Sequence, residues 1–137
     1  MGGILACVTE PDVDAALVVD VFARNCASRD LLADVAGKWS VLALLALDEG
    51  GYRFNALRRR VEGVSEKMLA QGLQILERDG WVHREVRSTI PPHVEYRLTG
   101  AGAELVPHLL GLIGFVEERM PAVHAARAAV GEVRPSR

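Results

Sequence analysis

Apolar residues in the middle of the chain recur every three or four positions, which is the spacing of an amphipathic helix with one buried face. The clearest example is the stretch from Gly63 to Trp81, where Ser65 favours a helix start and Asp79-Gly80 favours a stop. Its apolar stripe contains Leu69, Leu73 and Leu76. Its polar side contains Lys67, Gln71, Gln74 and Arg78. The pattern predicts a helix that packs on one side and offers amides and cations on the other.

The same spacing predicts helices before and after this one. They are a helix from Asp12 to about Arg24, a short helix capped by Ser28 and closed by Gly37, a helix over residues 38–50, a helix over residues 55–61, a long last helix capped by Thr99 that runs to about Met120, and a short final helix opened by Pro121. The helix over residues 38–50 is apolar on nearly its whole circumference, which indicates a buried position. A short extended piece is expected at residues 52–54.

After Asp79-Gly80 the apolar period changes from that of a helix to that of a strand. Alternation of apolar and polar residues runs through residues 81–87 and again through residues 93–99. The segment between them, STIPP, has two prolines and no glycine, so it should form a stiff projecting tip rather than a tight turn. These segments predict a β-hairpin with a long tip.

The order helix, turn, helix, hairpin predicts a mainly α fold with a small β-hairpin, the α+β arrangement of a winged helix-turn-helix. The helix before the turn carries Arg58, Arg59 and Arg60, and the four-residue turn contains Gly63. The outer face of the next helix has Gln and Lys in place of Glu–Lys pairs. Gln can pair with adenine, and Lys can reach guanine or phosphate. We therefore expect this helix to enter a DNA major groove and the hairpin to contact the backbone or the minor groove.

Several segments together resemble the HxlR family of bacterial transcription regulators, which is related to the MarR-like group. The resemblance covers about Cys26 to Val116 and implies a homodimeric, cytoplasmic DNA-binding protein whose terminal helices form the dimer. It also implies DNA contacts by residues of the recognition helix and phosphate contacts by Lys38, Arg58 and the wing arginines. The matching segments are GKW at 37–39, YRFNALRRRVEGVSEKMLAQGLQILERDGWVHR at 52–84, PPHVEYRLT at 91–99 and a run of glycine, leucine and proline at 102–109.

Residue type, spacing and this resemblance together give one set of candidate DNA-binding residues. We expect the protein to be a sequence-specific transcriptional regulator that binds a double-stranded, inverted-repeat operator as a homodimer. The side chain of Arg87 is expected to face solvent and to carry no core contact. The candidate residues are Lys38, Arg58, Arg59, Ser65, Lys67, Met68, Gln71, Gln74, Arg84, Arg87 and His93.

The two ends of the chain are expected to build the dimer around a central DNA-binding domain. The expected division is a leader and helix that form a dimer arm at residues 1–25, a winged helix-turn-helix domain at 26–99, and dimerisation helices with a tail at 100–137. One apolar stripe suffices to pack a helix on so small a domain, so a second stripe on the last helix predicts a partner copy. A helix buried on both sides within one chain is the alternative. The stripe assigned to the dimer is Leu105, Leu109, Leu112 and Val116.

Composition narrows the function without identifying it. The 137 residues carry a net charge of −2, yet residues 38–97 hold ten Lys and Arg against eight Asp and Glu, a net of +2, while the rest of the chain has a net of −4. This asymmetry has the right sign for an anionic partner at the centre of the chain. No apolar run is long enough for a membrane span, and two cysteines are too few for a disulfide-stapled scaffold, so a cytoplasmic location is expected.

No catalytic constellation can be defended from residue spacing, so an enzyme is not expected. The four histidines have no metal-ligand spacing to one another or to the cysteines, and we expect neither a metal nor a cofactor. Gly100 and Gly102 lie between a strand and a helix, but the third glycine of a dinucleotide fingerprint is missing. The main alternative is a winged-helix module that binds proteins without reading DNA, in which the outer face and Arg58–Arg60 are merely solvated.

Cys26 is a candidate redox sensor. It lies near a predicted helix start, where the helix dipole favours a thiolate, and Arg24 and Arg29 are close in sequence. Some HxlR-type regulators resemble this arrangement and use that cysteine to sense oxidants or quinones. Oxidation would link Cys26 to its mate across the dimer or to Cys7. A small, buried packing residue is the alternative, and a small-molecule effector is the other kind of signal that the sequence leaves open.

Overall fold

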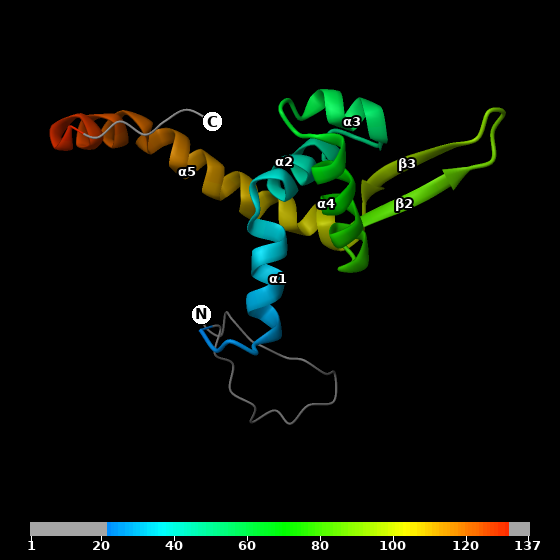
Figure 1. Cartoon of the computed structure of the whole chain (residues 1–137), viewed down its shortest axis with the longest axis horizontal. Helices are drawn as coiled ribbons and strands as arrows, with labels where there is room; N and C mark the ends of the chain where they lie inside the picture. Colours follow the sequence, from blue (N-terminus) through cyan, green and yellow to red (C-terminus); the bar gives the residue numbers. More distant parts are fainter. Residues whose placement is uncertain (1–21, 132–137) are drawn as a thin grey trace.

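The computed structural model describes residues 22–131, which form five helices and one three-stranded antiparallel sheet (Figure 1). This is the expected winged helix-turn-helix order. The long last helix extends to one side of the body, and the hairpin projects on the other side. The elements are α1 (Ala27–Ala36), α2 (Lys38–Leu47), β1 (Tyr52–Arg53), α3 (Phe54–Arg60), α4 (Glu66–Arg78), β2 (Val82–Arg87), β3 (His93–Leu98) and α5 (Gly100–Val130).

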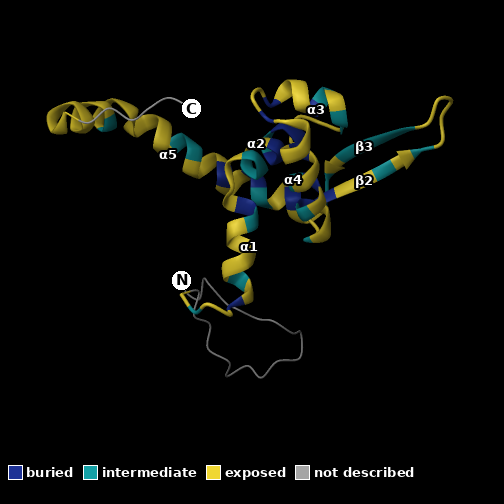
Figure 2. Ribbon diagram, viewed as in Figure 1, coloured by how far each residue is buried: buried dark blue, intermediate teal, exposed yellow. Residues whose placement is uncertain are grey.

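The core lies where α2, α3 and α4 meet the base of the hairpin and the first turns of α5 (Figure 2). Trp39 and Trp81 are partly buried and pack against this core. Truncation of one buried leucine to alanine typically costs about 2–5 kcal/mol of folding stability. The buried leucines of the core therefore hold α3 and α4 in their mutual positions. The side chains with less than 2 % exposure are Leu44, Leu57, Leu69, Leu73, Leu76 and Val106.

The turn between α3 and α4 fixes how the second helix is presented. Gly63 has φ +94°, a left-handed conformation that strains other residues, and a Cβ there would lie 3.6 Å from the Trp39 ring. Val61 and Val64 are buried on either side of it. The backbone N–H of Met68 donates to Ser65 Oγ at 3.0 Å, which confirms Ser65 as the N-cap of α4.

The hairpin has two unlike faces because paired residues point to the same side and successive residues alternate. The pairs Val82↔Leu98 and Arg84↔Tyr96 lie on one face. The first pair packs in or against the core, and the second pair lies further out, beside α4. The opposite face carries the intervening residues. β1 pairs with β3 at Tyr52↔Tyr96, so β3 is the central strand. The opposite face contains His83, Glu85, Arg87, His93, Glu95 and Arg97.

The start of α5 is packed closely against the end of α4. Thr99 Oγ1 accepts the backbone N–H of Gly102 at 3.1 Å and donates to the carbonyl of Gly80 at 2.6 Å. A Cβ on Gly102 would lie 2.2 Å from the carbonyl oxygen of Trp81, so only glycine fits at this position. The glycine that suggested a nucleotide fingerprint therefore has a packing role.

Three expectations about the helices are wrong. Pro121 does not open a separate helix, because α5 continues through it and through Pro107 to Val130, and loss of one interior N–H does not end the helix here. Ser28 does not cap the first short helix, which begins at Ala27. Residues 22–25 form turns instead of the end of a helix, and the rest of the helix expected from Asp12 lies outside the described residues.

Candidate nucleic-acid interface

The outer face of α4 and the inner face of the hairpin border one open hollow of about 520 Å³. Lys67, Gln71 and Gln74 lie on the α4 side and are exposed, as their spacing predicted. Arg84 and Tyr96 are cross-strand partners on the hairpin side. The hollow thus combines two cations, two amides and one phenol with the single carboxylate of Glu77. Cations, amides and phenols bond to phosphate and to base edges.

Tyr96 was not recognised from the sequence as part of this surface. Its place in an alternating strand indicated only an inward-facing side chain. The signal that could have found it is the register, because Tyr96 lies directly opposite Arg84 and must share its face.

The cations of α3, α4 and β2 divide into two groups, those in ion pairs and those that make neither an ion pair nor a hydrogen bond. Within residues 22–131, the side chains of the second group make no hydrogen bond or ion pair, and they remain available to an anion. They come from α3, from α4 and from the side of β2 that faces α4. The second group includes Arg58, Arg59, Lys67 and Arg84.

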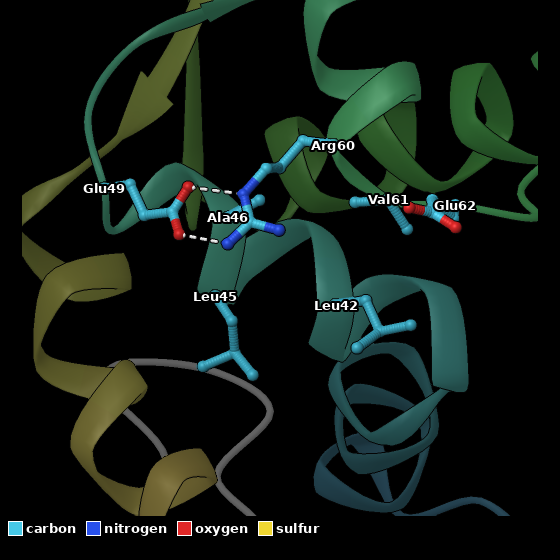
Figure 3. Close-up of a pocket in the computed structure, with 7 residues that line it drawn as sticks. All are labelled: Leu42, Leu45, Ala46, Glu49, Arg60, Val61 and Glu62. Carbon is cyan, nitrogen blue, oxygen red and sulfur yellow. Dashed lines mark hydrogen bonds and ion pairs between the residues drawn. The ribbon is translucent and has the colours of Figure 1, made fainter.

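Arg60 belongs to the first group. Its Nε and Nη2 donate to the two carboxylate oxygens of Glu49 at 2.9 and 2.5 Å (Figure 3). The hydrogen bonds from Arg60 and then from Tyr52 lower the pKa of Glu49 to about 2. The pair closes one side of a hollow over Leu42, Leu45 and apolar neighbours, and it braces α3 against the end of α2.

Arg78 also belongs to the first group, although its spacing on α4 suggested the outer face. Its Nη2 lies 3.0 Å from Asp34 Oδ2 and its Nε lies 3.0 Å from Asp79 Oδ1. Asp34 is on α1, so Arg78 ties the end of α4 to another helix. The polar face that is open to a ligand is therefore shorter than the sequence indicated.

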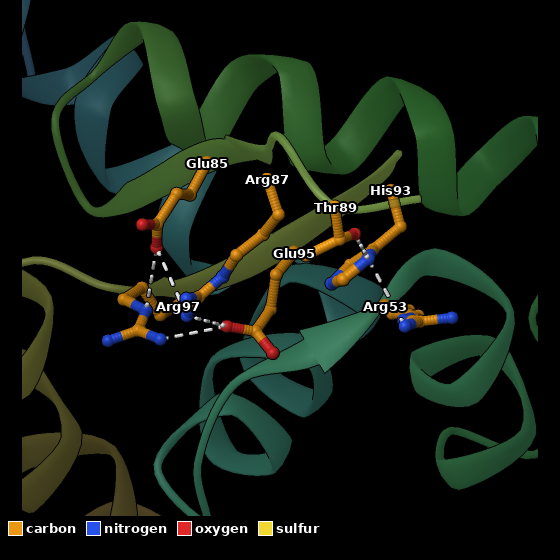
Figure 4. Close-up of polar contacts among 7 residues, drawn as sticks. All are labelled: Arg53, Glu85, Arg87, Thr89, His93, Glu95 and Arg97. Carbon is orange, nitrogen blue, oxygen red and sulfur yellow. Dashed lines mark hydrogen bonds and ion pairs between the residues drawn. The ribbon is translucent and has the colours of Figure 1, made fainter. Parts of the chain in front are cut away.

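The expectation for Arg87 is wrong. The residue is half-buried on the hairpin face opposite α4, and its Nη2 donates to Glu95 Oε1 at 3.0 Å (Figure 4). Glu85 Oε1 lies 3.6 Å from the same nitrogen. The sequence places Arg84 and Arg87 in one basic segment, but the pleat turns their side chains to opposite faces.

The remaining candidate DNA contacts lie at the edges of the region. The Lys38 ammonium lies 4.6 Å from the centroid of the Trp39 ring at the start of α2, and Met68 is 45 % exposed. His93 Nδ1 lies 3.2 Å from Arg53 Nη2 and 3.1 Å from Thr89 Oγ1, so it belongs to the base of the hairpin tip.

The stripe assigned to the dimer divides into two parts. Leu105 and Leu109 pack in the core of their own chain, whereas Leu112 and Val116 are 61 % and 49 % exposed. The exposed part of α5 continues with other large apolar residues that the stripe did not include. These are Leu110, Phe115, Met120 and Val130.

Cys26 is buried at the position before α1, and its Sγ lies 3.1 Å from Ser28 Oγ. It is disulfide-bonded, whereas Cys7, to which the sequence offered a link, lies outside the described residues. Among residues 22–131, no cluster of three or more His, Cys, Asp or Glu residues could hold a metal ion. No helix in this part of the chain has the length and apolar character that crossing a bilayer requires.

Comparison with known proteins supports the architecture described above. The HTH-type transcriptional regulator YtfH of Escherichia coli K12 is 47 % identical over 108 residues, which cover 79 % of this chain and 86 % of that protein. The structure of a transcriptional regulator ytfH from Salmonella typhimurium superposes with a TM-score of 0.74 at 45 % identity, covering 81 % of this chain and 99 % of that one. The oxidised form of the redox regulator HypR superposes with a TM-score of 0.62 at 38 % identity, covering 68 % and 96 %.

A family model described as HxlR-like helix-turn-helix matches residues 34–124. The match includes α2, α3 and α4, the whole hairpin and most of α5. These are the elements that carry the amides and unpaired cations of the interface. With that match and relatives of this identity and coverage, the chain belongs to the HxlR-like helix-turn-helix family.

Proposed function

We propose that the protein is a sequence-specific transcriptional regulator of the cytoplasm that binds double-stranded operator DNA through α4 and the hairpin. One observation carries the proposal. Arg60, Arg78 and Arg87 are neutralised by carboxylates, whereas Lys67 and Arg84 border the hollow between α4 and the hairpin without any partner among the described residues. Cations left unpaired on one surface suit a polyanion, and exposed glutamines between them suit base edges.

We assign the residues of the interface to two kinds of DNA contact, base contacts and phosphate contacts. Gln71 and Gln74 are exposed on the face of α4 that would enter the major groove, and each side chain can present a donor and an acceptor to adenine. Arg58 and Arg59 border a second open hollow with Asn55 at the turn before α4. In this proposal they bind phosphate and set the register of α4 on the duplex.

We also propose that the protein acts as a homodimer. The exposed apolar residues of α5 beyond Leu109 are not part of the core that residues 22–131 form, and such a surface on a helix is typical of an interface between copies. A two-fold dimer places its two recognition helices about one helical turn apart on DNA, roughly 34 Å. The operator should therefore be an inverted repeat.

The signal proposed for this regulator is a change in the oxidation state of Cys26. The proposal is supported by the disulfide that Cys26 forms and by the similarity to the redox regulator HypR. Two thiols become one disulfide when an oxidant such as diamide accepts two electrons and two protons. We expect diamide and thiol reagents to switch DNA affinity in the wild type and to leave Cys26→Ser unchanged. Unchanged affinity of the wild type in both states would contradict the proposal.

The experiment that tests the main proposal is a salt titration of duplex binding. Lys67→Ala and Arg84→Ala should each weaken binding and remove about 0.9 from the slope of log affinity against log salt. Arg127→Ala is the matched control, because it removes an exposed, unpaired cation near the far end of α5. A wild-type protein that binds no duplex at low salt would refute DNA binding and favour a protein-binding module.

A further inference from the structure

The face of the hairpin turned away from α4 carries a compact group of four charges. Glu85 and Glu95 are direct cross-strand partners, so their side chains lie on the same face, where dashed lines join both carboxylates to the arginines (Figure 4). Like charges directly opposite each other destabilise a strand pair. The arrangement therefore requires cations between them, and Arg87 and Arg97 supply these. We call these four residues the wing cluster.

Glu95 is the centre of the wing cluster. Its Oε1 accepts from Arg97 Nη2 at 2.8 Å and from Arg87 Nη2 at 3.0 Å. Glu85 Oε1 lies 3.5 Å from Arg97 Nε and 3.6 Å from Arg87 Nη2, so each arginine contacts both carboxylates. Hydrogen bonds from Arg97 and then from Arg87 lower the pKa of Glu95, which keeps it charged at neutral pH. The cluster as a whole has no net charge.

The surroundings of the cluster restrict its movement. A Cβ on Gly51 would lie 2.9 Å from Glu95 Cδ, so the backbone before β1 passes directly over this carboxyl group. Arg87 Nε is buried and has no acceptor among the described residues. Two of the cluster's side chains are thus partly buried, in contrast to the exposed Arg84 on the other face of the same hairpin.

We infer that the wing cluster withholds Arg87 and Arg97 from DNA phosphates and so limits the sequence-independent part of DNA affinity. A phosphate that took either arginine would leave the two carboxylates with only one cation to bridge them. Each phosphate contact changes affinity by about 3.5-fold between 50 and 200 mM salt. Holding two arginines in the cluster therefore lowers the affinity for random DNA and leaves the base contacts of α4 unchanged. The ratio of specific to non-specific affinity rises as a result. This inference rests on the proposed DNA-binding function.

The test compares Glu95→Gln, Arg87→Gln and the double variant on a random duplex at several salt concentrations. Arg87→Gln alone should leave the salt slope at the wild-type value, because the cluster already occupies this arginine. Glu95→Gln should steepen the slope by about 0.9–1.8, corresponding to one or two released arginines. The double variant should have a shallower salt slope than Glu95→Gln, because it lacks the arginine that Glu95→Gln releases at position 87. Thermal melts of each variant report any loss of folding separately.

Two results would overturn the inference. One is a folded Glu95→Gln variant with the wild-type slope, which would make the cluster a brace for the hairpin and nothing more. The other is a shallower slope for Arg87→Gln, which would make Arg87 an ordinary phosphate contact; this result decides the matter even when Glu95→Gln does not fold.

A measurement without DNA separates this inference from the proposed function. The buried Arg87 Nε–H should give a slowly exchanging NMR signal in the wild type that exchanges faster in Glu95→Gln. If the wild type bound no DNA, the function would fail while this signal still reported on the cluster. Equal exchange in both proteins would show that Glu95 does not hold Arg87.

Discussion

Gln71→Ala and Arg58→Ala should weaken DNA binding in two distinguishable ways. Gln71 is exposed in the hollow between α4 and the hairpin, and its amide is the size and type of group that reads adenine. Arg58 is exposed on α3 near the turn and has no partner among residues 22–131. The first variant should therefore lose discrimination between sequences, and the second should lose affinity on every sequence.

The magnitudes follow from one lost contact in each case. Losing a good base contact costs about 1–3 kcal/mol, or roughly 5- to 150-fold in affinity, and only on the preferred site. Losing one phosphate contact reduces the salt slope by about 0.9, so the fall in affinity between 50 and 200 mM salt becomes about 3.5-fold smaller. Neither side chain is buried, so the melting temperatures should stay near the wild-type value.

Fluorescence anisotropy with a labelled specific duplex and a labelled random duplex measures both effects. Each protein is titrated at three or more salt concentrations, with Arg127→Ala as the control for a cation outside the interface. The reasoning is refuted if Gln71→Ala weakens both duplexes equally or if Arg58→Ala weakens only the specific one.

Three further predictions concern assembly, packing and pH. Leu112→Glu/Phe115→Glu should give a folded monomer in sedimentation, because both side chains are more than half exposed on α5; a dimer of this variant would refute the interface. Gly102→Ala should destabilise the fold by about 1–3 kcal/mol or more through the clash with Trp81 O, and an unchanged melting temperature would contradict this. The pKa of Glu49 lies below its ordinary 4.5 at about 2, so its ion pair stabilises the fold above pH 4.5 and is lost as the pH falls toward 2; Glu49→Gln should flatten the acid dependence of the melting temperature over that interval.

Local patterns predicted the elements of this fold well. The spacing of Leu69, Leu73 and Leu76 identified the buried face of α4, and these three side chains are at most 2 % exposed. Ser65 and Thr99 are N-caps as expected. Both predictions depend on neighbours within a few residues along the chain, which is the range that periodicity and capping rules cover.

Pairings between distant residues could not be predicted in this way. Arg78 looked like part of the outer face of α4, but its partner Asp34 is 44 residues away in the sequence. Arg87 looked like a solvent-facing cation until the hairpin register placed it beside Glu95. Charge type and spacing locate cations on an element, but only the tertiary arrangement decides which of them are already neutralised.

The division of α5 was beyond sequence reasoning for a similar reason. Its two apolar stripes are continuous along the helix, and nothing in the residue pattern marks where the body of the domain ends. The structure places that limit near Leu109, which is 8 % exposed, before Leu112, which is 61 % exposed. The residues that remain for a partner copy are therefore further along the helix than the stripe alone suggested.

Selection of DNA sequences by the purified protein tests the central claim most directly. Random duplexes retained by the wild type should converge on an inverted repeat whose half-sites are centred about 10 bp apart. Arg58→Ala should retain the same sequence, while Gln71→Ala should lose the preference at one position in each half-site. Retained duplexes without a shared sequence, from a wild-type protein that is folded and binds DNA, would contradict the claim that α4 reads base edges.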